Sequence, residues 1–303
     1  MKKVSFLLIP LILMVCVGCN GKHEHSFGDL FVSKDECWHT YVEGSDFDPD
    51  GLEISMKCKD CGEVKKVSYS LENDTSLSLE QTSVKATYKG KSLDIEIKVK
   101  TKYHVACIGD SLTYGHMWRD KAYPVYLASK VSDKYEVGNF SYNGLSITGY
   151  GGSFDDPNER YIVREEYKQS VAFAPDIFAI MLGTNDATGW AKAEPTFEEE
   201  YKTLLNSYIE QFPNAKFIMM VSPPVIQNTF SIPNDVIKES VNPIQRSLAE
   251  EYEFEVLDLR EEFETHENYE TDYLRPNDGV HFTEAAADYV AGRVWEIAQD
   301  LRF

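Results

Sequence analysis

The sequence predicts an α/β protein in which helices cover a parallel sheet, preceded by a smaller β-rich region. From residue 101 to residue 303, short apolar runs of strand length alternate with longer segments of helical character. Such alternation is typical of a parallel sheet with helices on both faces. Upstream, residues 85–99 alternate apolar and charged side chains, which indicates half-exposed strands. We therefore expect a domain boundary near residue 100.

Five apolar runs in the C-terminal two-thirds have the length and composition of buried strands. They are Tyr103–Ile108, Tyr135–Phe140, Asp176–Leu182, Lys216–Val221 and Phe254–Leu259. Segments of helical character lie between or after them, among them Phe197–Phe212, Asp235–Tyr252 and Thr283–Leu301. Thr283 suits the N-cap of the last helix, and Glu284 is favourable in its first turn. In such sheets the catalytic and ligand-binding residues lie at the carboxyl ends of the strands.

The charge of the chain narrows the choice of partners. The 303 residues carry a formal net charge of −20 at pH 7, and 43% of them are hydrophobic. A strongly acidic surface repels nucleic acid and anionic lipid, so we expect neither as an electrostatic partner. The hydrophobic content is sufficient for an ordinary core.

Residues 1–18 have the pattern of a bacterial lipoprotein signal peptide. Two lysines precede the apolar run Val4–Val17, which is too short to span a bilayer comfortably. We expect lipid attachment at Cys19, which would leave the protein exported and anchored to the cell membrane, facing outside the cytoplasm. Cys16 departs from the pattern, because an aliphatic residue is usual three positions before the lipidated cysteine. An ordinary secretory signal is the alternative.

A small cysteine–histidine module is predicted for residues 19–61, and residues 62–100 are predicted to form a short β-rich segment, too short for a full sandwich. A C-x-x-C pair, a third cysteine and a histidine would supply four tetrahedral ligands to a structural zinc ion. The candidates are Cys58, Cys61, Cys37 and His25, with His39 able to replace His25. A disulfide between two of these cysteines is the alternative in an exported chain, and free thiols without a metal are a third possibility.

Four short segments that carry reactive or polar residues follow predicted strands or precede a predicted helix. They are Gly109–Thr113 (Gly-Asp-Ser-Leu-Thr), Asn139–Ser146, Gly183–Asp186 (Gly-Thr-Asn-Asp) and Asp278–His281 (Asp-Gly-Val-His). Taken singly, each has an ordinary explanation as a helix cap, a turn or a surface loop. Together, their order and their positions at strand ends favour one shared site.

These segments contain the components of nucleophilic acyl transfer. A histidine can take the proton of Ser111 and later give it to the leaving group, while a nearby carboxylate fixes the imidazole tautomer. Three-residue spacing can bring Asp278 and His281 onto one turn. Asn185 can aim an amide N–H at a developing oxyanion, and a glycine such as Gly144 lets the backbone approach a ligand closely.

Through these four segments, residues 103–303 resemble the SGNH (GDSL-like) hydrolases. The resemblance implies a three-layer α/β/α domain with a mainly parallel five-stranded sheet and an open, shallow site. It implies that Ser111 is the nucleophile and that His281, oriented by Asp278, is the base. The backbone N–H groups of Ser111 and Gly144 would hold the oxyanion together with the Asn185 amide. Other glycines close by compete with Gly144 for this role, namely Gly149, Gly151 and Gly152.

Two further expectations concern the loops of this site. Asp110 and Asp186 are expected to brace their loops rather than take part in the chemistry. Gly149–Arg160 and Thr188–Pro195 are expected to form the rim of the pocket. Catalysis of this type needs no cofactor.

The sequence therefore predicts a serine ester hydrolase that acts through an acyl-enzyme. Surface tethering and abundant aromatic residues favour a carbohydrate O-acetyl or O-acyl esterase acting on acetylated glycan. A lysophospholipase- or thioesterase-type acyl hydrolase, an acyltransferase and a non-catalytic glycan- or partner-binding lipoprotein are the alternatives. The chain contains no Gly-x-Ser-x-Gly pentapeptide and no His-Glu-x-x-His segment, which argues against an α/β-hydrolase and a zinc protease.

Overall fold

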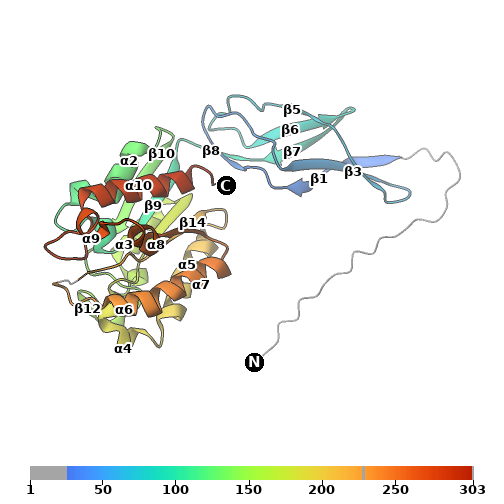
Figure 1. The fold of residues 1–303 in the computed structure, drawn as a ribbon. Coiled ribbons are helices and arrows are strands. Elements are labelled where there is room, and N and C mark those ends of the chain that lie inside the picture. Colours follow the sequence, from blue (N-terminus) through green and yellow to red (C-terminus); the bar gives the residue numbers. More distant parts are fainter. Residues whose placement is uncertain (1–25, 227–228, 302–303) are drawn as a thin grey trace.

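The computed structural model describes residues 26–226 and 229–301. It contains an N-terminal β module, residues 27–100, and a C-terminal α/β domain that begins at residue 103 (Figure 1). The predicted signal peptide, the lipidation candidate Cys19 and the ligand candidate His25 lie outside the described residues. Within the two described ranges, no helix is both long enough and apolar enough to cross a membrane.

The α/β domain is built on a five-stranded parallel sheet with the strand order β10-β9-β13-β14-β15. This is the predicted sheet, and every strand overlaps its predicted range. The first strand lies between the second and the third, so the direction of chain progress across the sheet reverses there. Ligands of open parallel sheets bind at such a reversal. The strands are β9 (Tyr103–Gly109), β10 (Tyr135–Ser141), β13 (Ile177–Met181), β14 (Lys216–Val221) and β15 (Glu255–Asp258).

Helices cover both faces of the sheet because alternate residues of a strand point to opposite sides. In β9, Val105 and Cys107 join one hydrophobic cluster, whereas Ala106 and Ile108 join the other. The first cluster packs against α2 (Tyr123–Lys130), α8 (Leu259–Glu264) and α10 (Glu284–Ala298). The second packs against α3 (Glu165–Phe173), α5 (Phe197–Gln211) and α7 (Asn242–Glu251). The expected three-layer architecture is confirmed.

Local signals in the sequence account for the ends of two helices. Thr283 caps α10 as expected, because its Oγ1 accepts a hydrogen bond from the Ala286 N–H at 3.2 Å. The single helix predicted over Asp235–Tyr252 is interrupted instead. It comprises α6 (Asn234–Val236), a π-helical turn at Ile237–Val241, and α7. Pro243 has no N–H to donate to the preceding turn, which breaks the regular hydrogen-bond ladder at this point.

Short elements complete the α/β domain. They are α1 (Ser111–Tyr114), β11 (Tyr150–Gly151), β12 (Phe154–Asp155), α4 (Trp190–Ala193) and α9 (Tyr269–Asp272), with 3-10 turns at Arg119–Lys121, Pro157–Glu159, Tyr161–Val163 and Asp186–Gly189.

The N-terminal module consists of two three-stranded antiparallel sheets, β1-β3-β4 and β5-β6-β7, and a parallel pair, β2-β8. Both larger sheets contribute to one core, which includes Ile54, Val84 and Ile95. The sequence predicts two separate segments, residues 19–61 and residues 62–100, whereas the structure pairs β3 with β4 across that boundary. The strands are β1 (Phe27–Asp35), β2 (Thr40–Val42), β3 (Leu52–Cys58), β4 (Val64–Lys66), β5 (Ser70–Glu72), β6 (Ser83–Tyr88), β7 (Lys91–Glu96) and β8 (Lys98–Lys100).

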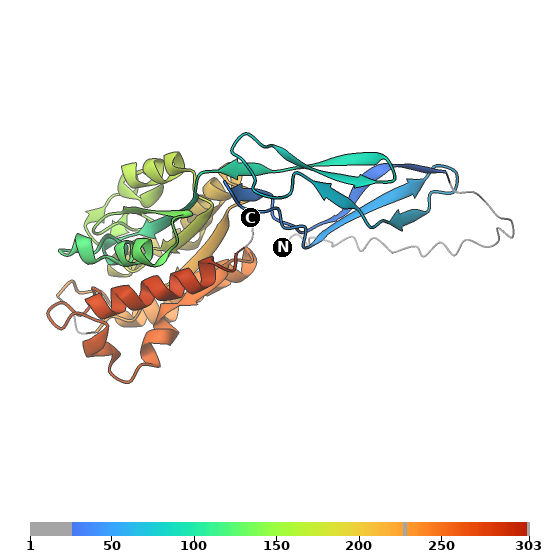
Figure 2. The same ribbon diagram turned by 90° about the horizontal axis from the view of Figure 1, so that it is seen from above.

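The module contacts the α/β domain at the start of β9, and Figure 2 shows it extending away from that end. The Tyr103 hydroxyl donates to the carbonyl of Thr40 at 3.1 Å, and the ring of Trp38 lies edge-on to that of Tyr103 with centroids 6.3 Å apart. Lys100 and Asp176 form a largely buried ion pair at 2.6 Å. The junction therefore lies at the amino-terminal edge of the sheet, opposite the edge where the strands end.

The pairing of β1 with β3 separates the cysteines that the sequence grouped around one zinc ion. The first residue of β1 lies opposite Cys58, and its last residue, Asp35, lies opposite Leu52. Cys37 is two residues beyond Asp35, at the other end of the strand pair. Six residues of strand span about 20 Å, whereas the ligands of a tetrahedral zinc ion lie about 4 Å apart. Cys37 cannot share one ion with Cys58 and Cys61, and the predicted ligand set must be revised.

Candidate active site

The four segments singled out in the sequence meet at the carboxyl edge of the sheet. Ser111 follows β9, Gly144 follows β10 and Asn185 follows β13, while His281 lies just before α10. These four residues line one cavity of about 170 Å³. Asp278 lies behind His281, in contact with its imidazole. The structure therefore brings together all five of the residues that the sequence assigned to the chemistry.

Ser111, His281 and Asp278 form a continuous chain of hydrogen bonds. The Oγ of Ser111 lies 2.9 Å from Nε2 of His281, and Nδ1 of His281 lies 3.0 Å from Oδ2 of Asp278. The other carboxylate oxygen accepts the backbone N–H groups of Val280 and His281, both at 2.9 Å. This geometry suits a neutral imidazole that accepts the serine proton at Nε2 and donates from Nδ1.

Burial and neighbouring groups shift the pKa values of Asp278 and His281. Burial would raise the pKa of Asp278, but the hydrogen bonds from His281 and from two backbone N–H groups lower it to about 2. Burial lowers the pKa of His281, the bond to Asp278 opposes that change, and the nearby His116 and Arg275 lower it further. At neutral pH the carboxylate is thus ionised and the imidazole is able to accept a proton.

Ser111 is held at a sharp transition from strand to helix. The preceding residue, Asp110, is fully buried, and its Oδ1 caps α1 by accepting the Leu112 N–H at 2.9 Å. Because Ser111 is the first residue of α1, its own N–H has no acceptor within the helix. Burial raises the pKa of Asp110 to about 7. The sequence expectation that Asp110 braces this loop agrees with its contacts.

Gly144 adopts a backbone conformation that favours glycine. Its φ is +76°, and an added Cβ would lie 2.7 Å from the backbone nitrogen of Ser153. Among the competing glycines, Gly152 also lines the cavity, whereas Gly149 and Gly151 are not among its described lining residues.

Asp186 braces the loop that follows Gly144. Its carboxylate accepts the N–H groups of Ile147 and Thr148, each at 3.0 Å, and the Thr148 hydroxyl at 2.8 Å. Asp186 is fully buried, and burial raises its pKa to about 6. The loop that carries Gly144 is thereby tied to the segment that carries Asn185.

Asn185 forms part of the cavity wall, but its amide already has partners. Its Nδ2 donates to the carbonyl of Leu145 at 2.9 Å and to Oδ2 of Asp110 at 3.2 Å. These bonds fix the side chain in place next to Ser111. To donate to an oxyanion, the amide must share or exchange one of them when substrate binds, so this role stays a prediction.

Sequence reasoning missed two aromatic neighbours of the base. The ring of His116 stacks on that of His281, and the ring of Phe230 lies edge-on to both. His116 lies five residues after Ser111, which is a signal that could have been used. The loop that carries Phe230 has no recognisable signature. The expected rim loops contribute in part, through Gly152, Ser153 and Thr188.

A serine–histidine–aspartate chain at the reversal point of a parallel sheet is the arrangement of a serine hydrolase. The model of the GDSL-like lipase/acylhydrolase family matches residues 107–289, and the chain belongs to that family.

Known esterases are similar to part of the chain. An acetylxylan esterase from Xylanibacter ruminicola is 28% identical over 176 residues, a match that covers 51% of this chain and 35% of that protein. The chain thus spans about a third of that relative's length. The aryl esterase of M. smegmatis has a TM-score of 0.53 at 18% identity, covering 66% of this chain and all of that one. An acetyl xylan esterase structure has a TM-score of 0.50 at 20% identity, and the match covers 64% of this chain and 98% of that one. These structural likenesses support the fold.

Proposed function

We propose that this protein is a serine esterase that removes short O-acyl groups, acetyl foremost, from carbohydrate. The observation that carries the proposal is the hydrogen-bonded chain from Ser111 through His281 to Asp278, on the wall of a small cavity. Its family membership and the acetylxylan esterase among its relatives support the choice of substrate.

The size of the cavity favours a short acyl group. A cavity of about 150 Å³ holds benzene, and this one measures about 170 Å³. That volume suits an acetyl group or a slightly longer acyl group, and it is small for the acyl chain of a lysophospholipid. The lining includes side chains that can hydrogen-bond sugar hydroxyls, namely Asn143, Ser153 and Thr188.

The chemistry follows from the residues that line the cavity. His281 takes the proton of Ser111 as Oγ attacks the ester carbonyl, and the negative charge on the carbonyl oxygen is met by the N–H groups of Ser111 and Gly144 and by Asn185. The protonated His281, stabilised by Asp278, then gives that proton to the departing sugar oxygen. Water attacks the acyl-enzyme with His281 as base, which releases the carboxylic acid and restores Ser111.

An ester panel tests this function. Acetate release from acetylated xylan and from other acetylated glycans is compared with hydrolysis of a lysophospholipid, a thioester and p-nitrophenyl acetate. We expect turnover of acetylated glycan and a strong preference for short acyl groups. Ser111→Ala should lower kcat by at least about 1,000-fold without changing Tm. Ser129→Ala, an exposed serine in α2 that bonds the Tyr126 carbonyl, is the matched control.

Other outcomes would replace the proposal. Preference for the lysophospholipid or the thioester would make the protein an acyl hydrolase of those substrates. Acyl transfer to an added sugar in place of water would make it an acyltransferase. No turnover, together with no fluorophosphonate labelling of Ser111, would leave a non-catalytic binding protein.

We further propose that the enzyme is exported and held at the cell membrane by a lipid on Cys19. The support is the signal-peptide pattern of residues 1–18 and the small residue that precedes the cysteine. Metabolic labelling with a radioactive fatty acid in a bacterial host should mark the chain, and Cys19→Ser should abolish the label. Labelling that persists in Cys19→Ser would contradict the proposal.

A further inference from the structure

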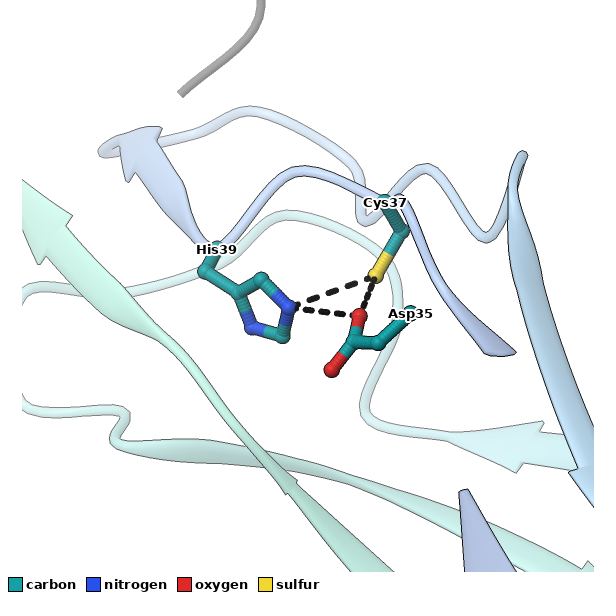
Figure 3. A group of neighbouring side chains, drawn as sticks. All are labelled: Asp35, Cys37 and His39. Carbon is teal, nitrogen blue, oxygen red and sulfur yellow. Dashed lines mark hydrogen bonds and ion pairs between the residues drawn. The ribbon is translucent and has the colours of Figure 1, made fainter. Parts of the chain in front are cut away.

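Three potential metal ligands lie side by side at the end of β1. Asp35 is the last residue of β1, and the chain bends at Cys37 before β2 begins at Thr40. This bend lets the side chains of Asp35, Cys37 and His39 meet (Figure 3). Nε2 of His39 lies 2.7 Å from Oδ1 of Asp35, and Sγ of Cys37 lies 3.4 Å from that oxygen. Sγ of Cys37 also lies 3.7 Å from Nε2 of His39. One carboxylate, one thiol and one imidazole thus converge on a single point.

A contact from outside the group orients the imidazole. Nδ1 of His39 lies 2.9 Å from the backbone carbonyl of Glu96, on β7. A carbonyl can only accept, so Nδ1 carries the proton and donates to it. In the neutral ring, Nε2 is then left with a lone pair directed at Asp35 and Cys37. Histidines that bind metals commonly have such a partner on the second nitrogen, which fixes the tautomer and the plane of the ring.

The separations between the three ligand atoms are close to those around a tetrahedral zinc ion. With usual Zn–S, Zn–N and Zn–O distances, the S–N and S–O edges of the tetrahedron measure about 3.6 Å and the N–O edge about 3.3 Å. The observed S–N and S–O distances are 3.7 and 3.4 Å. Only the N–O distance of 2.7 Å must lengthen, because without an ion these atoms are hydrogen-bonded.

We propose that Asp35, Cys37 and His39 bind one Zn²⁺ ion, with water as the fourth ligand. Cys37 is buried, whereas the side chains of Asp35 and His39 are 41% and 37% exposed, which leaves a side open to solvent for that water. A thiolate, an imidazole and a carboxylate suit zinc among the common divalent ions. On binding, two protons are released to solvent, one from the thiol of Cys37 and one from the hydrogen bond between His39 Nε2 and Asp35 Oδ1. This site replaces the four-ligand set expected from the sequence.

The location of the site indicates a structural role. Trp38, between two of the ligands, packs on Tyr103 at the start of β9, and the carbonyl of His39 accepts the N–H of Lys98 at 2.7 Å. The ion would therefore hold the end of β1 against β7 and β8, at the junction with the α/β domain. The inference is independent of the proposed esterase activity, since the junction lies at the opposite edge of the sheet from Ser111.

Metal binding by the purified full chain, prepared without a histidine tag, tests the site. After chelation the chain is titrated with Zn²⁺, bound metal is counted by mass spectrometry, and Co²⁺ is used as a probe for thiolate-to-metal absorption. We expect Cys37→Ser, His39→Ala and Asp35→Asn each to weaken binding at this site by at least about 10-fold. Cys37→Ser should also abolish the cobalt–thiolate band from this site. In the wild type, Zn²⁺ should change the fluorescence of Trp38 and raise Tm.

The matched control is the double variant Cys58→Ser/Cys61→Ser, which removes the other cysteine pair of the module. It should keep the ion, the cobalt–thiolate band and the Zn²⁺-dependent rise in Tm. Circular dichroism of every variant in chelator checks that the module is folded. Loss of the ion in this control with retention in Cys37→Ser and His39→Ala would overturn the proposal. So would a folded wild type that binds no Zn²⁺, because the three side chains would then form only a hydrogen-bonded ion pair with a thiol beside it.

Discussion

The imidazole of His116 stacks on the imidazole of His281, with ring centroids 4.3 Å apart and planes inclined by 20°. His116 is held in turn by Asn143, whose Oδ1 lies 3.1 Å from its Nδ1, and by Arg275, which donates to its backbone carbonyl at 2.6 Å. The base is therefore fixed by Asp278 at one nitrogen and by His116 on one face. We therefore expect His116 to act as a positioning residue for His281.

Removing this stack should weaken catalysis without abolishing it. An aromatic pair contributes about 0.5–1.5 kcal/mol beyond its buried area, which corresponds to roughly a 2- to 10-fold loss of kcat/KM in His116→Ala. His116→Phe keeps an aromatic face and should restore most of the loss. His266→Ala removes a histidine stacked on Tyr273 away from the site, and should change nothing. Equal losses in both alanine variants would rule out a specific role for His116.

The pH profile should show that His281 works at lower pH than an ordinary histidine. Burial lowers its pKa below the usual 6.5, and His116 and Arg275 add to this effect against the opposing bond to Asp278. Activity requires the neutral imidazole, so kcat/KM should fall as pH decreases, and the midpoint of that fall should lie below pH 6.5. Asp278, with a pKa of about 2, remains ionised over this range. A fall in kcat/KM with its midpoint above pH 6.5 would contradict the assignment of His281 as the titrating base.

Asp278→Asn should lower kcat by about 100- to 10,000-fold, because an amide can no longer select the Nδ1–H tautomer of His281. The amide oxygen can still accept the backbone N–H groups of Val280 and His281, so a change in Tm should be small. Single-turnover acylation kinetics measure the effect. Asp272→Asn is the control, since Asp272 forms an exposed pair with His266 at 2.8 Å. A fully active Asp278→Asn would mean that the carboxylate does not orient the base.

Gly144→Ala should reduce both stability and activity. The residue has φ +76°, and a Cβ would collide with Ser153, which shifts the N–H expected at the oxyanion. Gly90→Ala provides a matched control, because Gly90 has φ +77° and open space around it in the β6–β7 hairpin. Both variants should lose about 1–2 kcal/mol from backbone strain. Only Gly144→Ala should also have a lower kcat/KM. Urea unfolding measures the stability of both variants, and ester hydrolysis measures their kcat/KM.

Asp186→Ala should destabilise the α/β domain by about 3 kcal/mol, because three buried donors from Ile147 and Thr148 lose their charged acceptor. The loop that carries Gly144 should loosen, with a fall in kcat/KM. Asp156→Ala removes an exposed carboxylate that, within residues 26–226 and 229–301, accepts from Asn158 alone, and it should lose less than about 1 kcal/mol. Urea unfolding measures the free energy of unfolding of both variants. Equal decreases in the two would show that Asp186 does not brace the loop.

Much of this architecture can be predicted because it is signalled locally. The five strands are apolar runs of strand length, and Thr283 is recognisable as a cap from its side chain and its position before a helical segment. Ser111, Asn185 and His281 can be found because each occupies a short segment at the end of a strand or the start of a helix. The π-helical turn before α7 was missed, although Pro243 in the sequence marks its place.

Other features depend on how distant segments pair. The Cys58–Cys61 spacing is compatible with zinc, but the register of β1 against β3 decides that Cys37 lies at the other end of the strand pair. Register is set by which apolar residues of two strands share a core, and not by the spacing of cysteines along the chain. The bend at Cys37, just after the end of β1, brings Asp35, Cys37 and His39 together. Their spacing is visible in the sequence but is informative only once that bend is known.

The sequence by itself determined the α/β class and the order of the strands along the chain, and it predicted Ser111, Asp278 and His281 as site residues. Only the tertiary structure decided that Ser111 and His281, 170 residues apart, lie within hydrogen-bond distance, and that His116 covers the base. The physical reason is that periodicity and turn chemistry act between near neighbours in the chain. Contacts across the sheet exist only when its strands, packed helices and long loops are assembled together.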